Sequence, residues 1–282
     1  MIRILSDSTC YLSPELVEQY HLTILPLHVL LGEQDLLDGV NVDEDTIFAW
    51  ADQNKTTPHT AAPSVDEVME YFKPILDAGD EIICFSISGS MSNSLNVLRM
   101  TAEVLNAEDR ISLIDSENLS TGIGLQILHA ADMAAAGKSR AEIVEEIEAL
   151  RPKVRASFVI DTLTYLYRGG RCSGMAALMG GVLKLHLEII VHDGAMSPSK
   201  KYRGKMNAVY LNYAKDLEEA MRNAYTNRVF VTHTCQDEEG PKAVIEYVKS
   251  LGIFDEVLET KAGGVVSSHC GPGTLGVLFI SK

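Results

Sequence analysis

One stretch, residues 86–94 (Ser-Ile-Ser-Gly-Ser-Met-Ser-Asn-Ser), most constrains how this chain can fold. It follows an apolar run at 81–85, which has the length and composition of a buried strand. It precedes residues 95–105, where leucine and valine recur near helical spacing. A strand that enters a helix through Ser-Gly-Ser leaves backbone N–H groups without intrahelical partners. Those groups and the helix dipole favour a bound carboxylate or phosphate, although a serine-capped turn without a ligand also explains the residues.

The same order of strand, polar turn and helix recurs through the first half of the chain. Residues 6–9 (Ser-Asp-Ser-Thr) follow an expected strand at 2–5, and Asp115 and Ser116 follow another at 110–114. Helical stretches separate these strands. This order predicts a parallel α/β sheet whose ligands gather at the carboxyl ends of the strands.

Proline and glycine refine this prediction at two places. Pro26 interrupts an apolar run at 23–31, so we expect one bent or edge strand there. Gly122 and Gly124 lie in the expected helix 120–136. The rest of a dinucleotide-binding motif is missing, so these glycines indicate close helix packing and no nucleotide cofactor.

The pattern restarts in the second half, which divides the chain into domains at 1–155 and 156–282. The expected elements are a strand at 156–160, a buried helix at 173–185, a hairpin turning at Asp193-Gly194, a long helix at 204–224, strands at 228–232 and 254–258, a short helix at 262–268 and a last strand at 275–280. The resulting fold class is α/β with two domains, the first built on a mainly parallel sheet.

Composition excludes several classes of function. A net charge of −15 disfavours nucleic acid and anionic membranes as partners. The chain contains no run of about 18 apolar residues, so the sequence predicts no transmembrane segment. The five cysteines are scattered without a Cys-x-x-Cys pair, which argues against disulfides and fits a reducing cytoplasm. His233 and Cys235 have the spacing of two metal ligands, but no further ligands accompany them, so we expect no metal site.

Two other classes of protein stay open at this point. Ser88, Asp115 and His269 occur in the chain order of a hydrolase triad, which would make Ser88 the nucleophile of an acyl hydrolase. The flanking glycines of a nucleophile elbow are absent around Ser88. The α/β architecture alone also allows a relative of sugar-kinase or dihydroxyacetone-kinase subunits.

Seven short motifs then occur in order along the whole chain. They are 6–9 (Ser-Asp-Ser-Thr), 60–64 (Thr-Ala-Ala-Pro-Ser), 88–90 (Ser-Gly-Ser), 115–116 (Asp-Ser), 169–171 (Gly-Gly-Arg), Asp193-Gly194 with Lys201 and Arg203, and 269–273 (His-Cys-Gly-Pro-Gly). In this order and spacing the chain resembles the DegV family, whose members bind fatty acids and include the fatty-acid-binding subunits of bacterial fatty acid kinase.

The resemblance implies a lipid carrier without catalysis of its own. A long-chain fatty acid would lie in a tunnel between the two domains, and an ATP-dependent fatty acid kinase protein would phosphorylate its carboxylate. The carboxylate contacts carry over to Thr60, Ser88, Gly89 and His269, and the contact with the kinase partner carries over to Arg171. Two alternatives stay open. In one, His269 is a structural residue of its glycine turn, and in the other, Arg171 is a structural arginine paired with an acid.

The chain departs from the family pattern at three places. Ala61 and Ala62 leave one hydroxyl fewer before Pro63, Cys270 follows His269 where a threonine is usual, and residues 184–187 read Lys-Leu-His-Leu. These departures leave Thr60, Ser88 and His269 in place but bear on the details of the head-group contacts and the shape of the tunnel.

Overall fold

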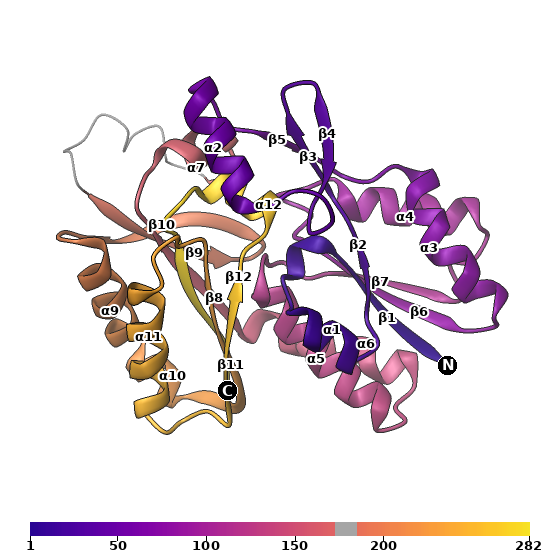
Figure 1. The fold of residues 1–282 in the computed structure, drawn as a ribbon. Helices are drawn as coiled ribbons and strands as arrows, with labels where there is room; N and C mark the ends of the chain where they lie inside the picture. The colour runs from indigo at the N-terminus through magenta and orange to yellow at the C-terminus, as the bar shows by residue number, and fades with distance from the viewer. Residues whose placement is uncertain (173–184) are drawn as a thin grey trace.

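The structure, a computed structural model, describes residues 1–172 and 185–282 (Figure 1). The strands of the first sheet are β1 (Ile2–Asp7), β2 (Thr23–Leu25), β6 (Glu81–Ser86) and β7 (Ile111–Asp115). The helices around it are α1 (Pro14–Gln19), α3 (Val65–Asp77), α4 (Ser94–Val104), α5 (Thr121–Ala135) and α6 (Arg140–Leu150), with 3-10 turns at Ser8–Cys10 and Arg151–Lys153. All neighbouring strands are parallel in the order β2-β1-β6-β7, with α3 and α4 on one face and α5 and α6 on the other. The predicted parallel α/β sheet is confirmed.

Strand β6 shows why both faces of this sheet are covered. Ile82 and Cys84 pack with residues of α3 and α4, whereas Ile83 and Phe85 belong to the core cluster around α5. Successive side chains of a strand point to opposite faces, so a continuous apolar run needs helices on both sides. This strand leads directly into the stretch 86–94.

The second half forms a six-stranded sheet in the order β10-β9-β8-β13-β11-β12, in which only β11 and β12 are parallel neighbours. Its strands are β8 (Val154–Ile160), β9 (His186–His192), β10 (Ala195–Tyr202), β11 (Ala224–His233), β12 (Glu256–Lys261) and β13 (Leu275–Ser281). Its outer face is covered by α9 (Met206–Asp216), α10 (Glu218–Arg222) and α11 (Glu239–Ser250). The predicted second α/β unit and its hairpin at Asp193-Gly194 are confirmed.

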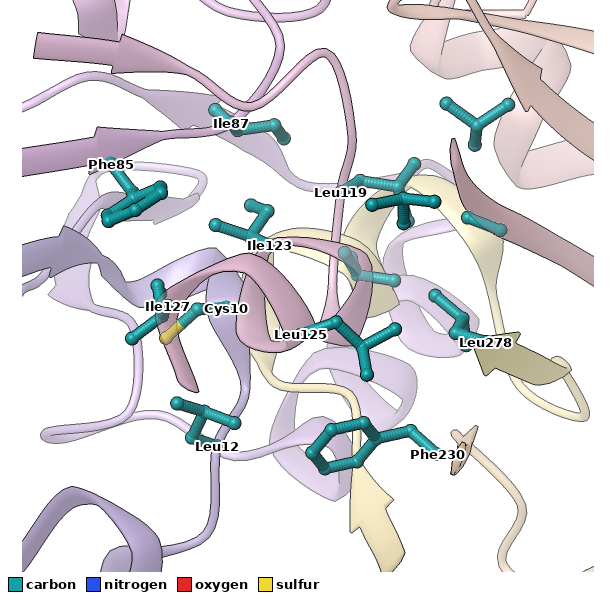
Figure 2. Packing of buried hydrophobic residues seen from close by; sticks show 14 of the residues in the cluster. Cys10, Leu12, Phe85, Ile87, Leu119, Ile123, Leu125, Ile127, Phe230 and Leu278 are labelled. Carbon is teal, nitrogen blue, oxygen red and sulfur yellow. The ribbon is translucent and has the colours of Figure 1, made fainter. Parts of the chain in front are cut away.

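Helix α5 lies between the two sheets and joins their cores. It contacts β1 and β6 on one side and β8, β11 and β13 on the other. In Figure 2, Ile127 points toward the first sheet near Phe85, while Leu125 points toward Leu278 and Phe230 of the second. A Cβ atom on Gly124 would lie 2.8 Å from Leu12, so this glycine permits close packing, as predicted.

A third, smaller sheet brings the two halves of the chain together. It pairs β4 (Gln34–Leu37), β3 (His28–Leu31) and β5 (His59–Ala61) in that order and packs on α2 (Glu44–Asn54), α7 (Thr164–Gly169) and α12 (Gly264–Cys270). Its core joins Val29 and Ile47 from the first half to Tyr165 and Val265 from the second. The site described below lies beside this junction.

Several expected boundaries were wrong. The run 23–31 divides at Pro26-Leu27 into β2 and β3, which belong to different sheets, because Leu27 leaves the first sheet to join the junction core. The helix expected at 204–224 divides into α9 and α10, the strand expected at 254–258 starts at Glu256, and the short helix expected at 262–268 starts at Gly264. The helix expected at 173–185 falls almost wholly outside the described residues. Strand β8 opens the second sheet at Val154, and the domain division at 155 stays a prediction.

Within 1–172 and 185–282, no helix has the length and apolar character needed to cross a membrane.

Candidate functional site

A cavity of about 110 Å³ lies where α12, β5 and the start of α4 approach one another. Its polar lining consists of Thr60, Ser92, Asn93, Arg171 and His269. The rest of its lining is aliphatic or sulfur-containing, from residues such as Leu27, Met91, Leu119, Met196 and Val266. The cavity therefore offers a few hydrogen-bonding groups beside an apolar wall, which suits an amphipathic ligand.

Thr60 and His269 face each other across this cavity. The Thr60 Oγ1 atom lies 2.9 Å from His269 Nε2, a contact between residues 209 positions apart. Strand pairing of Thr60 with Val29 fixes the backbone of the threonine. The two residues predicted to contact the carboxylate, Thr60 and His269, thus lie side by side.

His269 is neutral at pH 7 in this structure. Burial, and then the positive charges of Arg171 and His59, lower the pKa of His269 to about 4. Its Nδ1 atom is buried and has no hydrogen-bond partner in the described part of the chain. A Cβ atom on Gly169 would lie 2.5 Å from this Nδ1, so the imidazole is packed directly against the glycine.

The Gly-Gly-Arg motif forms the rim of the cavity next to His269. Gly170 has φ +67°, a left-handed conformation that ends α7 and favours glycine. Arg171, the next residue, is exposed, lines the cavity and donates from Nη1 to the Gly169 carbonyl at 2.7 Å. The structure thus places the predicted partner-binding arginine beside the predicted head-group residues.

Ser88 and Gly89 lie outside the lining of this cavity. The Ser88 hydroxyl is buried and donates to the Gly194 carbonyl at 2.6 Å. The Gly89 N–H donates to the Asp115 carboxylate, at 3.2 and 3.3 Å from its two oxygens. The predicted head-group role of these two residues has no support from their contacts.

Ser92 and Asn93, further along the same stretch, line the cavity instead. Asn93 is the N-cap residue of α4, and its side chain makes no capping bond to that helix. Because Ser92 and Asn93 line the cavity, the positive end of the α4 dipole lies beside it. The head-group role of Ser88 and Gly89 stays a prediction, while the cavity lining adds Ser92 and Asn93, for which the N-cap position was the available sequence signal.

The hydrolase triad is not formed. Ser88 donates to Gly194, Asp115 accepts from the N–H groups of Gly89 and Glu117, and His269 contacts Thr60. Among the described residues, none of the three triad candidates is hydrogen-bonded to another. A nucleophilic serine needs a base within hydrogen-bond reach, so this geometry gives the hydrolase alternative no support.

Two buried carboxylates hold the surrounding turns in place. Asp7 accepts from the Ile87 N–H at 2.7 Å and from the Ser86 hydroxyl at 3.2 Å. Asp38 accepts from the Gly264 N–H at 2.6 Å and thereby fixes the start of α12. Burial raises the pKa of both aspartates. Asp7 of the motif at 6–9 thus binds other residues of the protein.

A second, smaller cavity lies next to the first. Its volume is about 20 Å³, and it shares Leu119, Val266 and Cys270 with the first cavity. Further inside, Phe158 of β8 and Leu278 of β13 line it. Polar residues, including Thr232, His233 and Thr274, also line this second cavity, so the apolar lining of the first cavity adjoins a space of mixed polarity beside the second sheet.

Comparison with known proteins gives consistent matches over the full chain. The model of the family described as "Uncharacterised protein, DegV family" matches residues 1–282. A DegV domain-containing protein of Deinococcus radiodurans is 31% identical over 280 residues, covering 98% of this chain and 97% of that protein.

Solved structures match the fold equally well. One is a DegV family protein from Thermus thermophilus whose structure is described as showing fatty acid binding. It is 26% identical to this chain with a TM-score of 0.92, and the match covers 100% of this chain and 99% of that chain. A stearic acid-binding protein from Eubacterium ventriosum is 29% identical with a TM-score of 0.86, again covering 100% and 99%.

Proposed function

The chain belongs to the DegV family, and on this premise we propose that it is a carrier that binds one long-chain fatty acid. The observation that carries the proposal is the cavity lined by Thr60, His269 and the start of α4, which has an apolar wall and a second cavity next to it. The fatty-acid-binding relatives from Thermus thermophilus and Eubacterium ventriosum support the same ligand class.

The carboxylate would be held by groups that are already assembled. The Thr60 hydroxyl would donate to the carboxylate while it accepts from the Nε2–H of the neutral His269, and the N-terminus of α4 adds its dipole beside Ser92 and Asn93. An anion removed from water costs several kcal/mol unless such bonds replace its hydration. We propose this group of residues, in place of Ser88 and Gly89, as the head-group site.

The acyl tail would follow the apolar wall past Leu119 and Val266 toward Phe158 and Leu278. Burial of roughly 14 methylenes at about 0.8 kcal/mol each gives on the order of 11 kcal/mol before ordering costs. The tail thus supplies most of the affinity, while the polar end selects acids among lipids. The protein would open these cavities further when the tail enters.

We further propose that the carrier presents the carboxylate to an ATP-dependent fatty acid kinase protein, which forms the acyl-phosphate. Within the described residues none of the five cysteines forms a disulfide, which fits a cytoplasmic setting for this step. Arg171 is exposed on the rim of the cavity, where a partner that handles phosphate would meet it. The carrier itself needs no cofactor for this role.

Arg171→Ala tests this division of labour. The variant should bind fatty acid within about twofold of the unchanged protein, because tail burial dominates the affinity. It should lower acyl-phosphate formation by the kinase partner by about tenfold or more, since a charge at the contact steers and orients the partner. Arg168→Ala, on the last turn of α7, is the matched control. Equal loss of binding and phosphorylation would contradict the proposal.

The carrier function itself is tested by native mass spectrometry of the purified protein, followed by solvent extraction. We expect one fatty acid per chain, and the extract would identify the preferred tail. A protein that is empty and also fails to take up added palmitate or oleate would reject the proposal.

A further inference from the structure

The tip of the β9–β10 hairpin is hydrogen-bonded to the stretch 86–94. The Ser88 hydroxyl donates to the Gly194 carbonyl at 2.6 Å, across 106 residues of sequence. The Ser90 hydroxyl donates to the same carbonyl. Asp193 and Gly194 both have positive φ, at 48° and 74°, which makes the tight turn that presents this carbonyl.

Gly194 and Ser88 are tightly packed against each other at this contact. A Cβ atom on Gly194 would lie 2.6 Å from the Ser88 hydroxyl oxygen and 3.6 Å from Glu117. Ser88 is only 1% exposed, so its hydroxyl is hydrogen-bonded to the hairpin and shielded from water. Two hydroxyls on one buried carbonyl fill both of its lone pairs.

The contact also joins two walls of the cavity. Met91 and Ser92 line it directly after Ser90 in the chain, and Met196 lines it two residues after Gly194. Met196 is in turn bridged to Cys172, the residue after Arg171. Separation of the hairpin tip from the stretch 86–94 would therefore move Met196 away from Met91 and widen the cavity.

We propose that Ser88 and Ser90 hold Gly194 as a clasp that keeps the cavity closed around its ligand. We call this group the Gly194 clasp; it consists of Ser88, Ser90 and Gly194. The inference rests on the proposed fatty-acid function and adds the control of ligand release to it. In this role the two serines are positioning residues and do not touch the carboxylate.

A comparison of two ligands separates the clasp from a head-group contact. A serine that binds the carboxylate should matter for a fatty acid and much less for the primary alcohol of the same chain length. A clasp encloses both ligands alike. Loss of two buried hydrogen bonds should raise the dissociation rate about tenfold for each ligand.

The experiment measures release of palmitate and of hexadecanol by stopped-flow displacement from the Ser88→Ala/Ser90→Ala variant. Ser90→Ala alone is the milder variant if the double variant folds poorly, and Ser250→Ala, an exposed helix serine, is the matched control. Faster release of both ligands is expected. Unchanged release, or faster release of palmitate alone, would overturn the clasp.

A second readout needs no ligand. Hydrogen–deuterium exchange over residues 186–202 of the empty double variant should be faster than in the unchanged protein. Equal exchange there would overturn the clasp. If the unchanged protein binds neither ligand, the fatty-acid proposal fails, and the exchange result still decides whether the clasp exists.

Discussion

Asp38→Ala is expected to lower the free energy of unfolding by about 3 kcal/mol and to weaken fatty-acid binding at the same time. The carboxylate is 2% exposed and accepts from the Ser8 hydroxyl at 2.7 Å, the Tyr11 hydroxyl at 3.1 Å and the Gly264 N–H at 2.6 Å. Alanine leaves these donors buried without an acceptor, which costs more than the loss of the bonds themselves.

The effect on binding follows from where α12 begins. Asp38 receives the first N–H of this short helix, and the same helix carries His269 five residues later. A Cβ atom on Gly263 would lie 2.5 Å from Tyr11 and 2.9 Å from the Asp38 carboxylate, so the helix start is fitted to this pair. Loosening it should displace His269 from Thr60.

Urea unfolding and fatty-acid titration measure the two effects together. Asp35→Ala is the matched control, because Asp35 lies in β4 with a side chain 58% exposed that, within the described part of the chain, forms an ion pair with His28 alone. Only Asp35 of this pair is exposed, since the His28 side chain is 13% exposed, and we expect the pair to contribute about 1 kcal/mol or less. A loss for Asp38→Ala no larger than for Asp35→Ala would refute the role assigned to Asp38.

The N-terminal sheet was predictable because its signals are local. Strand β6 reads as a continuous apolar run, the turn after it is rich in serine, and α4 has helical periodicity, so each element is specified by its own residues. The strand β5 was missed because three residues, His59–Ala61, form a strand only when β3 lies beside them. Short strands depend on partners that sequence order does not reveal.

The same difference between local signals and long-range contacts applies to the candidate site. Thr60, Arg171 and His269 meet at one cavity as the family motifs implied. Ser88 does not join them, because a hairpin tip 106 residues away accepts its hydrogen bond. Asp38, which fixes α12 from a distance of 226 residues, carries no motif signal at all. Long-range contacts decide which polar residues remain available for a ligand.

The second large effect is expected from a single methyl group at Gly169. This glycine closes α7, and its missing side chain leaves room for the imidazole of His269. A Cβ atom there would lie 2.5 Å from His269 Nδ1, well inside van der Waals contact. The imidazole would have to move, and its 2.9 Å contact with Thr60 would be lost.

Gly169→Ala should therefore weaken fatty-acid binding by roughly 10- to 100-fold, the loss expected when hydrogen bonds to a charged group are removed. Alanine favours the helical conformation at the end of α7, but displacement of the buried imidazole should lower the free energy of unfolding by about 1–3 kcal/mol. Gly170→Asn is the matched control: Gly170 has φ +67° with no atom within 4 Å of an added Cβ, and asparagine tolerates that conformation. Calorimetric titration with palmitate measures both variants. Gly169 itself offers no side chain to a ligand, so a loss of affinity in Gly169→Ala alone would trace the head-group contact to His269. Equal affinities of the two variants for palmitate would show that binding does not need the imidazole in this position.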